Sequence, residues 1–256
     1  MSLDLNADLG EGMPDVDAAL MPLVTSANIA CGLHAGDAHT MARTVALALR
    51  HGVAIGAHPG YDDRLGFGRR PQQLSPPEVV ELVLYQLGAL DAIAQSLGAS
   101  VNHVKPHGAL YNHAEKDRAT AVAIITAMRS YDPRLRLVGR AQSAMQQAAS
   151  ALGQAFTPEA FADRRYLADG SLAPRSDPES VISDADAVDA QVRSLATEGE
   201  VVSIDGHRLK VAFRSLCVHG DTAGAPLLAG RVRQTLETLG ISLSAPRLLG
   251  IDTLPP

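Results

Sequence analysis

The chain of 256 residues carries 22 basic and 28 acidic side chains, which give a formal net charge of −6. This charge argues against a nucleic acid or an anionic membrane as a partner. Five tyrosines, four phenylalanines and no tryptophan are too few for a surface that stacks bases or sugars, whereas 46% hydrophobic residues exclude a disordered chain. We therefore expect a globular protein whose partner is a small molecule.

The start of the chain and its cysteines bear on the cellular compartment. The first ten residues, MSLDLNADLG, have neither the basic start nor the apolar run of a signal peptide, and no apolar stretch reaches the roughly 20 residues that span a bilayer. Cys31 and Cys217 are too few for a disulfide framework. We expect a soluble, cytoplasmic protein in which both cysteines are small buried residues rather than nucleophiles.

Short apolar runs alternate with helical patterns along the whole chain. They predict seven strands, at residues 3–8, 26–31, 53–58, 101–105, 135–139, 155–161 and 211–218. Apolar stripes predict helices over residues 41–52, 75–98, 181–199 and 228–240, each ending near a glycine, and a capping box opens the second of them. A β-hairpin is predicted around Asp205-Gly206.

This alternation, with no low-complexity linker, predicts one domain of residues 1–256 with a parallel sheet covered by helices. A closed (β/α) barrel is favoured over an open, doubly wound sheet. The first strand is followed by Leu9-Gly10-Glu11-Gly12-Met13-Pro14, which lacks the G-x-G-x-x-G of a dinucleotide-binding fold.

The first predicted strand alternates apolar side chains with Asp4, Asn6 and Asp8. Strands of a parallel sheet are usually apolar on both faces, and burial of unpartnered carboxylates costs several kcal/mol. The polar face therefore predicts a solvated pocket, a ligand or a cation. The alternative is an edge strand with one wet face.

Three histidines, His34, His58 and His219, follow predicted strands and precede a glycine by one or two residues. Because ligands of parallel α/β folds bind at the carboxyl ends of the strands, we expect these side chains to converge on one pocket. Lys105, one of only three lysines, ends the fourth strand on the same face as His103. It is predicted to hold a carboxylate or phosphate, polarise a carbonyl or act as a base; the alternative is a structural pair with a buried aspartate.

Two further segments carry charged residues that suit a site. Residues 60–70, GYDDRLGFGRR, are typical of a mobile lid that closes on an anion, or of a solvated charged loop. Glu159 and Asp163 are candidates for acid/base chemistry or a cation site, with a salt bridge as the alternative.

Six segments in this order resemble the LamB/YcsF family: LNADLGE (5–11), SANIACGLHAGD (26–37), GAHPGYDDRLGFGRR (56–70), VKPHGALYN (104–112), EAFADRRYLADGSLAPR (159–175) and CVHGD (217–221). Many family members carry Cys where this chain has Ala7, so a cysteine there cannot be an essential nucleophile, and Asp8 and Glu11 are the better candidates.

The resemblance implies a seven-stranded (β/α) barrel similar to the glycoside hydrolase and deacetylase barrels. It also implies ATP-dependent opening of 5-oxo-L-proline (pyroglutamate) to L-glutamate, together with the B and C subunits of a prokaryotic 5-oxoprolinase. ATP, accompanied by Mg²⁺, would then be a cosubstrate, although the chain contains no P-loop motif.

On this basis Lys105 and His107 are expected to face the carbonyl oxygen or a transferred phosphate, and Asp8 or Glu11 a cation or the attacking water. The candidate substrate-binding residues are Asn28, His58, Tyr61, Arg69, Arg70 and Glu159, and the candidate metal ligands are Asp8, His34 and His219. Two alternatives remain: a metal-dependent amide hydrolase or deacetylase that works without ATP, and a noncatalytic subunit that only binds the lactam.

Overall fold

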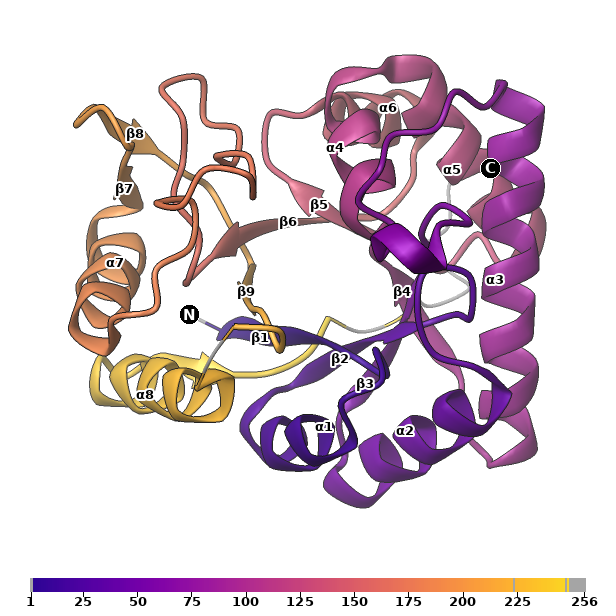
Figure 1. The fold of residues 1–256 in the computed structure, drawn as a ribbon, viewed down its shortest axis with the longest axis horizontal. Coiled ribbons are helices and arrows are strands. Elements are labelled where there is room, and N and C mark those ends of the chain that lie inside the picture. The colour runs from indigo at the N-terminus through magenta and orange to yellow at the C-terminus, as the bar shows by residue number, and fades with distance from the viewer. Residues whose placement is uncertain (1, 223, 247, 249–256) are drawn as a thin grey trace.

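Seven parallel strands form a closed barrel in the computed structural model, which describes residues 2–222, 224–246 and 248 (Figure 1). Each strand pairs with the next in chain order, and the last pairs with both the sixth and the first, which closes the ring. The barrel strands are β1 (Ser2–Leu9), β2 (Ser26–Ala30), β3 (Ala54–His58), β4 (Val101–Val104), β5 (Arg136–Arg140), β6 (Phe156–Phe161) and β9 (Ser215–Val218).

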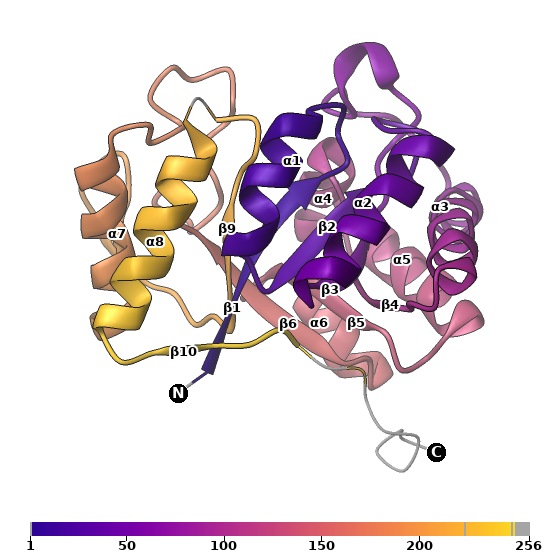
Figure 2. The same cartoon turned by 90° about the horizontal axis from the view of Figure 1, so that it is seen from below.

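Eight α-helices of the described residues surround these strands, and Figure 2 shows α8 packed between α1 and α7. They are α1 (Pro14–Leu20), α2 (Ala38–His51), α3 (Pro76–Ser96), α4 (Gly108–Lys116), α5 (Arg118–Tyr131), α6 (Ala144–Leu152), α7 (Ala185–Glu198) and α8 (Ala225–Thr238). Two 3-10 helices, η1 (Met21–Leu23) and η2 (Arg64–Gly66), lie in loops. Among the described residues, no helix combines the length and the hydropathy needed to cross a membrane.

The structure confirms the predicted barrel, and the first six strands lie within one residue of their predicted bounds. The predicted hairpin is also present, as antiparallel β7 (Glu200–Val202) and β8 (Arg208–Lys210). One short strand was not predicted: β10 (Ser242–Leu243), which pairs with the start of β1 outside the closed ring.

Four predicted starts were wrong. Helices α2 and α8 begin three residues before the predicted positions 41 and 228, and two other elements begin four residues later than predicted. The seventh strand begins at Ser215 rather than at Val211, because the Val211 N–H still donates to the Gly199 carbonyl next to the hairpin. The helix predicted from Val181 begins at Ala185, where the Asp184 side chain accepts a hydrogen bond from a backbone N–H of the first turn and caps the helix.

The two faces of β1 explain how the barrel is filled. Leu3, Leu5, Ala7 and Leu9 point outward into the hydrophobic core between strands and helices. On the other face, Asp4 accepts hydrogen bonds from the hydroxyls of Thr25, Ser26 and Ser215, which lie at the start of the two neighbouring strands. Since β1 is paired with β2 and β9 on its two sides, it is not an edge strand. The barrel interior is therefore polar, and it leads to the site described below.

A glycine in β3 allows one polar side chain to cross the barrel interior. A Cβ atom at Gly56 would lie 2.1 Å from His103 Nε2, too close for any carbon. We expect Gly56→Ala to lower the free energy of unfolding by about 3 kcal/mol, measured by urea denaturation. Gly230→Ala is the matched control, because Gly230 lies in α8 and a Cβ atom there would meet nothing within 4 Å. This substitution should leave the free energy of unfolding unchanged or raise it by up to about 1 kcal/mol. Equal stability of Gly56→Ala and the unaltered chain would contradict the packing described.

Candidate active site

A cavity of about 560 Å³ opens at the carboxyl ends of the barrel strands, a size typical of small-molecule sites. Residues that follow β1, β3, β4, β6 and β9 line it, as expected for a parallel barrel. Seven of the residues predicted from the sequence are in this lining: Asp8, Glu11, His58, Arg69, Lys105, His107 and His219.

Lys105 follows β4 and lies at the base of the cavity with 2% of its surface exposed. Its Nζ atom is 3.0 Å from Asp8 Oδ1 and 3.2 Å from Glu159 Oε2. Burial alone would lower the pKa of Lys105, but the Asp8 and Glu159 carboxylates outweigh it and raise the pKa well above its ordinary value. Lys105 is therefore a fixed cation, suited to an anion or a carbonyl oxygen and not to proton abstraction.

Asp8 is held in place from beneath by a chain of side-chain hydrogen bonds. Asn28 Nδ2 donates to Asp8 Oδ1 and to Asn6 Oδ1, both at 2.8 Å, and His103 Nε2 donates to Asn28 Oδ1 at 2.8 Å. Burial would raise the Asp8 pKa, but His58 and Lys105 hold it well below its usual range. Asn28, predicted to bind substrate, is fully buried and instead positions the Asp8 carboxylate.

Glu159, also predicted to bind substrate, is fully buried on β6 and faces Lys105. Burial, with Glu159 next in importance, raises the pKa of the neighbouring Tyr111 hydroxyl well above its ordinary value. Cys217 Sγ lies 3.1 Å from Lys105 Nζ, and burial raises the pKa of its thiol. Burial also raises the pKa of the Cys31 thiol, to about 12. Both cysteines are buried, as predicted.

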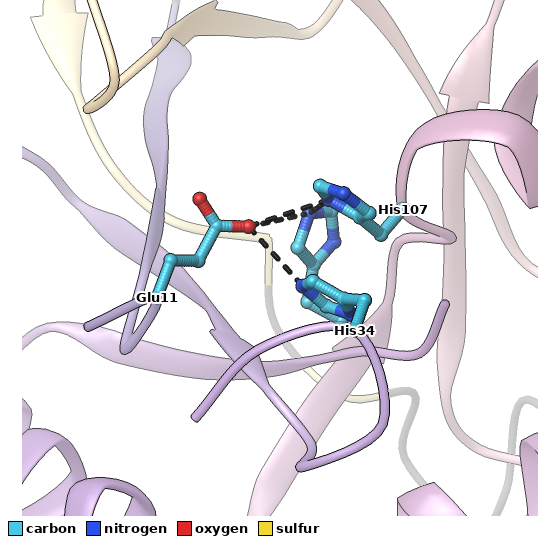
Figure 3. A group of neighbouring side chains, drawn as sticks. Glu11, His34 and His107 are labelled. Carbon is cyan, nitrogen blue, oxygen red and sulfur yellow. Dashed lines mark hydrogen bonds and ion pairs between the residues drawn. The ribbon is translucent and has the colours of Figure 1, made fainter. Parts of the chain in front are cut away.

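One carboxylate oxygen lies among three imidazole rings at the edge of the cavity (Figure 3). Glu11 Oε1 is 3.2 Å from His34 Nε2, 3.3 Å from His107 Nδ1 and 4.0 Å from His58 Nε2. Burial lowers the pKa of His34 to about 2 and that of His107 to about 3, and burial raises the pKa of Glu11. His34 and His107, whose rings stack with centroids 3.8 Å apart, are therefore neutral.

The three predicted metal ligands do not form one group. Asp8 and His219 lie together with Cys217, and their ligand atoms are within 4.8 Å of one another. His34 belongs to the separate cluster around Glu11. Spacing along the chain did not reveal this division, because the loop after β2 carries His34 next to Glu11, His58 and His107.

Asp163 follows β6 and orients His219. Its Oδ1 atom accepts from His219 Nδ1 at 2.9 Å, and its Oδ2 accepts from the His219 backbone N–H at 3.0 Å. Burial would raise the Asp163 pKa, but His219 and these hydrogen bonds outweigh it and lower the pKa. This buried contact with His219 corresponds to the salt-bridge alternative considered for Asp163.

The lowered pKa of Asp163 predicts a pH dependence of stability. The unfolded chain binds a proton near the ordinary pKa of 3.8, whereas the folded chain does so only at lower pH. The stabilisation is therefore complete above the unfolded pKa and is lost as the pH falls through the folded pKa. Urea denaturation over the acidic range should show a shallower loss of stability in Asp163→Asn than in the unaltered chain. Parallel curves would contradict this.

Three arginines are part of the cavity lining. Arg69 and Arg175 both pair with Asp221, the second through contacts of 3.1 and 3.3 Å, and Arg164 lines the cavity as well. Sequence reasoning selected Arg69 but missed Arg164 and Arg175. The available signal was their presence in the EAFADRRYLADGSLAPR segment, which follows a strand end.

Two predicted substrate-binding residues lie away from the cavity. The Arg70 side chain is 63% exposed and pairs with Asp63. Tyr61 is buried, and its hydroxyl hydrogen-bonds with His113 Nδ1 at 2.8 Å. Their loop, predicted as a lid, is fastened by Arg64, which donates to the carbonyl oxygens of two glycines in the loop after β2.

Comparisons with known proteins agree with this fold. The sequence model of the LamB/YcsF family matches residues 3–249. The A subunit of 5-oxoprolinase from Syntrophobacter fumaroxidans is 49% identical over 96% of this chain and 98% of its own length, and that from Nocardia farcinica is 49% identical over 96% and 99%. The crystal structure of a lactam utilization protein from Thermus thermophilus is 44% identical, covers 96% of this chain and 100% of its own, and superposes with a TM-score of 0.89. The chain therefore belongs to the LamB/YcsF family.

Proposed function

We propose that this chain is the A subunit of an ATP-dependent 5-oxoprolinase, which opens 5-oxo-L-proline to L-glutamate together with B and C subunits. The observation that carries the proposal is the buried Lys105 cation in a cavity whose lining also contains Arg69, Arg164 and Arg175. A lactam that bears a carboxylate has two groups to match: a carbonyl oxygen for Lys105 and an anion for the arginines. The name of the relatives supports the same substrate.

The chemistry assigns a task to each of these groups. A five-membered lactam is a stable amide, so transfer of phosphate from ATP to the amide oxygen would create a leaving group before water attacks the ring carbon. Lys105 stabilises the negative charge on that oxygen. Asp8, kept ionised by its neighbours, is placed to orient the attacking water. The ring C–N bond then breaks, the nitrogen takes up a proton, and an acyl phosphate forms. A second water cleaves this acyl phosphate to the side-chain carboxylate of glutamate and free phosphate.

ATP with Mg²⁺ is a cosubstrate of the assembled complex in this proposal. The chain contains no P-loop, so the B and C subunits are the expected source of a nucleotide site. Because the reaction depends on ATP, we expect it to take place in the cytoplasm.

The test is release of glutamate from 5-oxo-L-proline by the purified chain alone and with B and C subunits, each with and without ATP. The proposal predicts glutamate only when all three subunits and ATP are present. Glutamate from this chain alone without ATP would overturn it in favour of a metal-dependent amide hydrolase. Full activity of B and C without this chain, while the chain still binds the lactam, would favour a noncatalytic binding subunit.

A further inference from the structure

The cluster of Glu11, His34, His58 and His107 has the dimensions of a tetrahedral metal site. Donor atoms about 2.0–2.1 Å from a zinc ion lie about 3.3–3.4 Å from one another. Glu11 Oε1 is 3.2, 3.3 and 4.0 Å from the three ring nitrogens, and His58 Nε2 is 3.0 Å from His107 Nδ1. All four donor atoms lie within 4.8 Å of one another.

The hydrogen-bond partners of two rings fix which nitrogens face the centre of this cluster. His58 Nδ1 lies 2.6 Å from the Lys105 carbonyl oxygen, and His107 Nε2 lies 2.8 Å from the Phe67 carbonyl oxygen. Because a carbonyl oxygen only accepts hydrogen bonds, each of these nitrogens carries a hydrogen. The other two ring nitrogens, His58 Nε2 and His107 Nδ1, therefore face each other at 3.0 Å. Histidines that bind metals are typically oriented in this way, by donating their other N–H to a carbonyl.

These two nitrogens also face a carboxylate oxygen. Glu11 Oε1 lies 3.3 Å from His107 Nδ1 and 4.0 Å from His58 Nε2. A metal ion at the centre would contact all three atoms together. The third ring, His34, is held by stacking on His107, and its Nδ1 atom has no hydrogen-bond partner among the described residues.

We propose that His34, His58, His107 and Glu11 bind a single divalent transition-metal ion. Three imidazole nitrogens and one carboxylate oxygen suit zinc or a similar ion rather than magnesium, which prefers oxygen ligands. Because Glu11, His58 and His107 also line the cavity, the ion faces the space assigned to the substrate. The proposal rests on the geometry of the cluster and stands whether or not the chain acts on 5-oxo-L-proline.

The test measures metal binding directly, without an activity assay. The full chain is stripped with a chelator, incubated with zinc, desalted and analysed for metal content, and Co²⁺ is titrated in parallel while its visible absorption is recorded. One zinc per chain and Co²⁺ bands of a tetrahedral site are expected. His107→Gln should weaken zinc binding at least about 100-fold, since even changes to groups around a ligand cost 10- to 100-fold.

The matched control is His207→Gln, because His207 lies in the exposed hairpin and its ring pairs only with Asp205 among the described residues. It should bind zinc like the unaltered chain, and circular dichroism verifies that both variants are folded. A desalted unaltered chain without stoichiometric zinc overturns the proposal. So does zinc that is retained in His107→Gln but lost in His219→Gln, which would assign the ion to the Asp8, Cys217 and His219 group.

Discussion

A Lys105→Met variant, supplied with B and C subunits and ATP, is expected to release glutamate about 100- to 1,000-fold more slowly than the unaltered chain. Removing one preorganised donor to a developing oxyanion typically has this effect. The loss is expected in kcat more than in KM, because the negative charge on the lactam oxygen grows as the reaction proceeds. Initial rates over a range of 5-oxo-L-proline concentrations separate the two parameters.

The same substitution leaves two buried carboxylates, Asp8 and Glu159, without their shared cation. Breaking a buried ion pair in this way costs about 3–5 kcal/mol of stability, so urea denaturation must accompany the kinetics. Lys210→Met is the matched control, because the Lys210 side chain is 76% exposed on the hairpin. It should retain normal turnover. Near-normal turnover by a folded Lys105→Met variant would remove Lys105 from the mechanism.

An Arg175→Gln variant is expected to raise the KM for 5-oxo-L-proline about 10- to 100-fold with a smaller effect on kcat. A charge-assisted hydrogen bond to a carboxylate contributes about 1.5–3 kcal/mol, and the substrate keeps its carboxylate unchanged during the reaction. Arg175 and Arg69 are both paired with Asp221, which holds their guanidinium groups at the cavity wall. Steady-state kinetics with the reconstituted complex measure the change.

Arg70→Gln provides the matched control, because Arg70 pairs with Asp63 and is largely exposed. Its KM should equal that of the unaltered chain. A lactam with a carboxamide in place of the carboxylate adds a second control: the unaltered chain should discriminate against it, and Arg175→Gln should do so less. If Arg70→Gln raised KM and Arg175→Gln did not, the carboxylate would bind elsewhere.

The sequence predicted the barrel well because its strands are short apolar runs bounded by glycine and by polar strand ends. Helices α1, α4, α5 and α6 were not predicted. Three of them, α1, α4 and α6, have only 7 to 9 residues, and the alanine-rich α5 buries small residues over a wide face rather than along a narrow apolar stripe. The start of β9 was misplaced because Val211 looks like a strand residue but belongs to the hairpin connection.

The site was predicted in part, for a physical reason. Strand-end residues such as Asp8, His58 and Lys105 could be located because the barrel brings all strand ends to one side. Residue type does not reveal how far a strand residue lies from the open end of the barrel. Asn28 and Glu159 were therefore expected in the cavity, but both are fully buried beneath it. The conformation of the loops could not be predicted from the sequence either, which is why Arg175 was missed.

The most direct test of the account is a crystal structure of this chain with 5-oxo-L-proline. The account predicts the lactam in the cavity at the strand ends, its carbonyl oxygen within hydrogen-bonding distance of Lys105 Nζ and its carboxylate against Arg69 and Arg175. A lactam bound outside this cavity, or with its carboxylate on Lys105 and its carbonyl on the arginines, would contradict it.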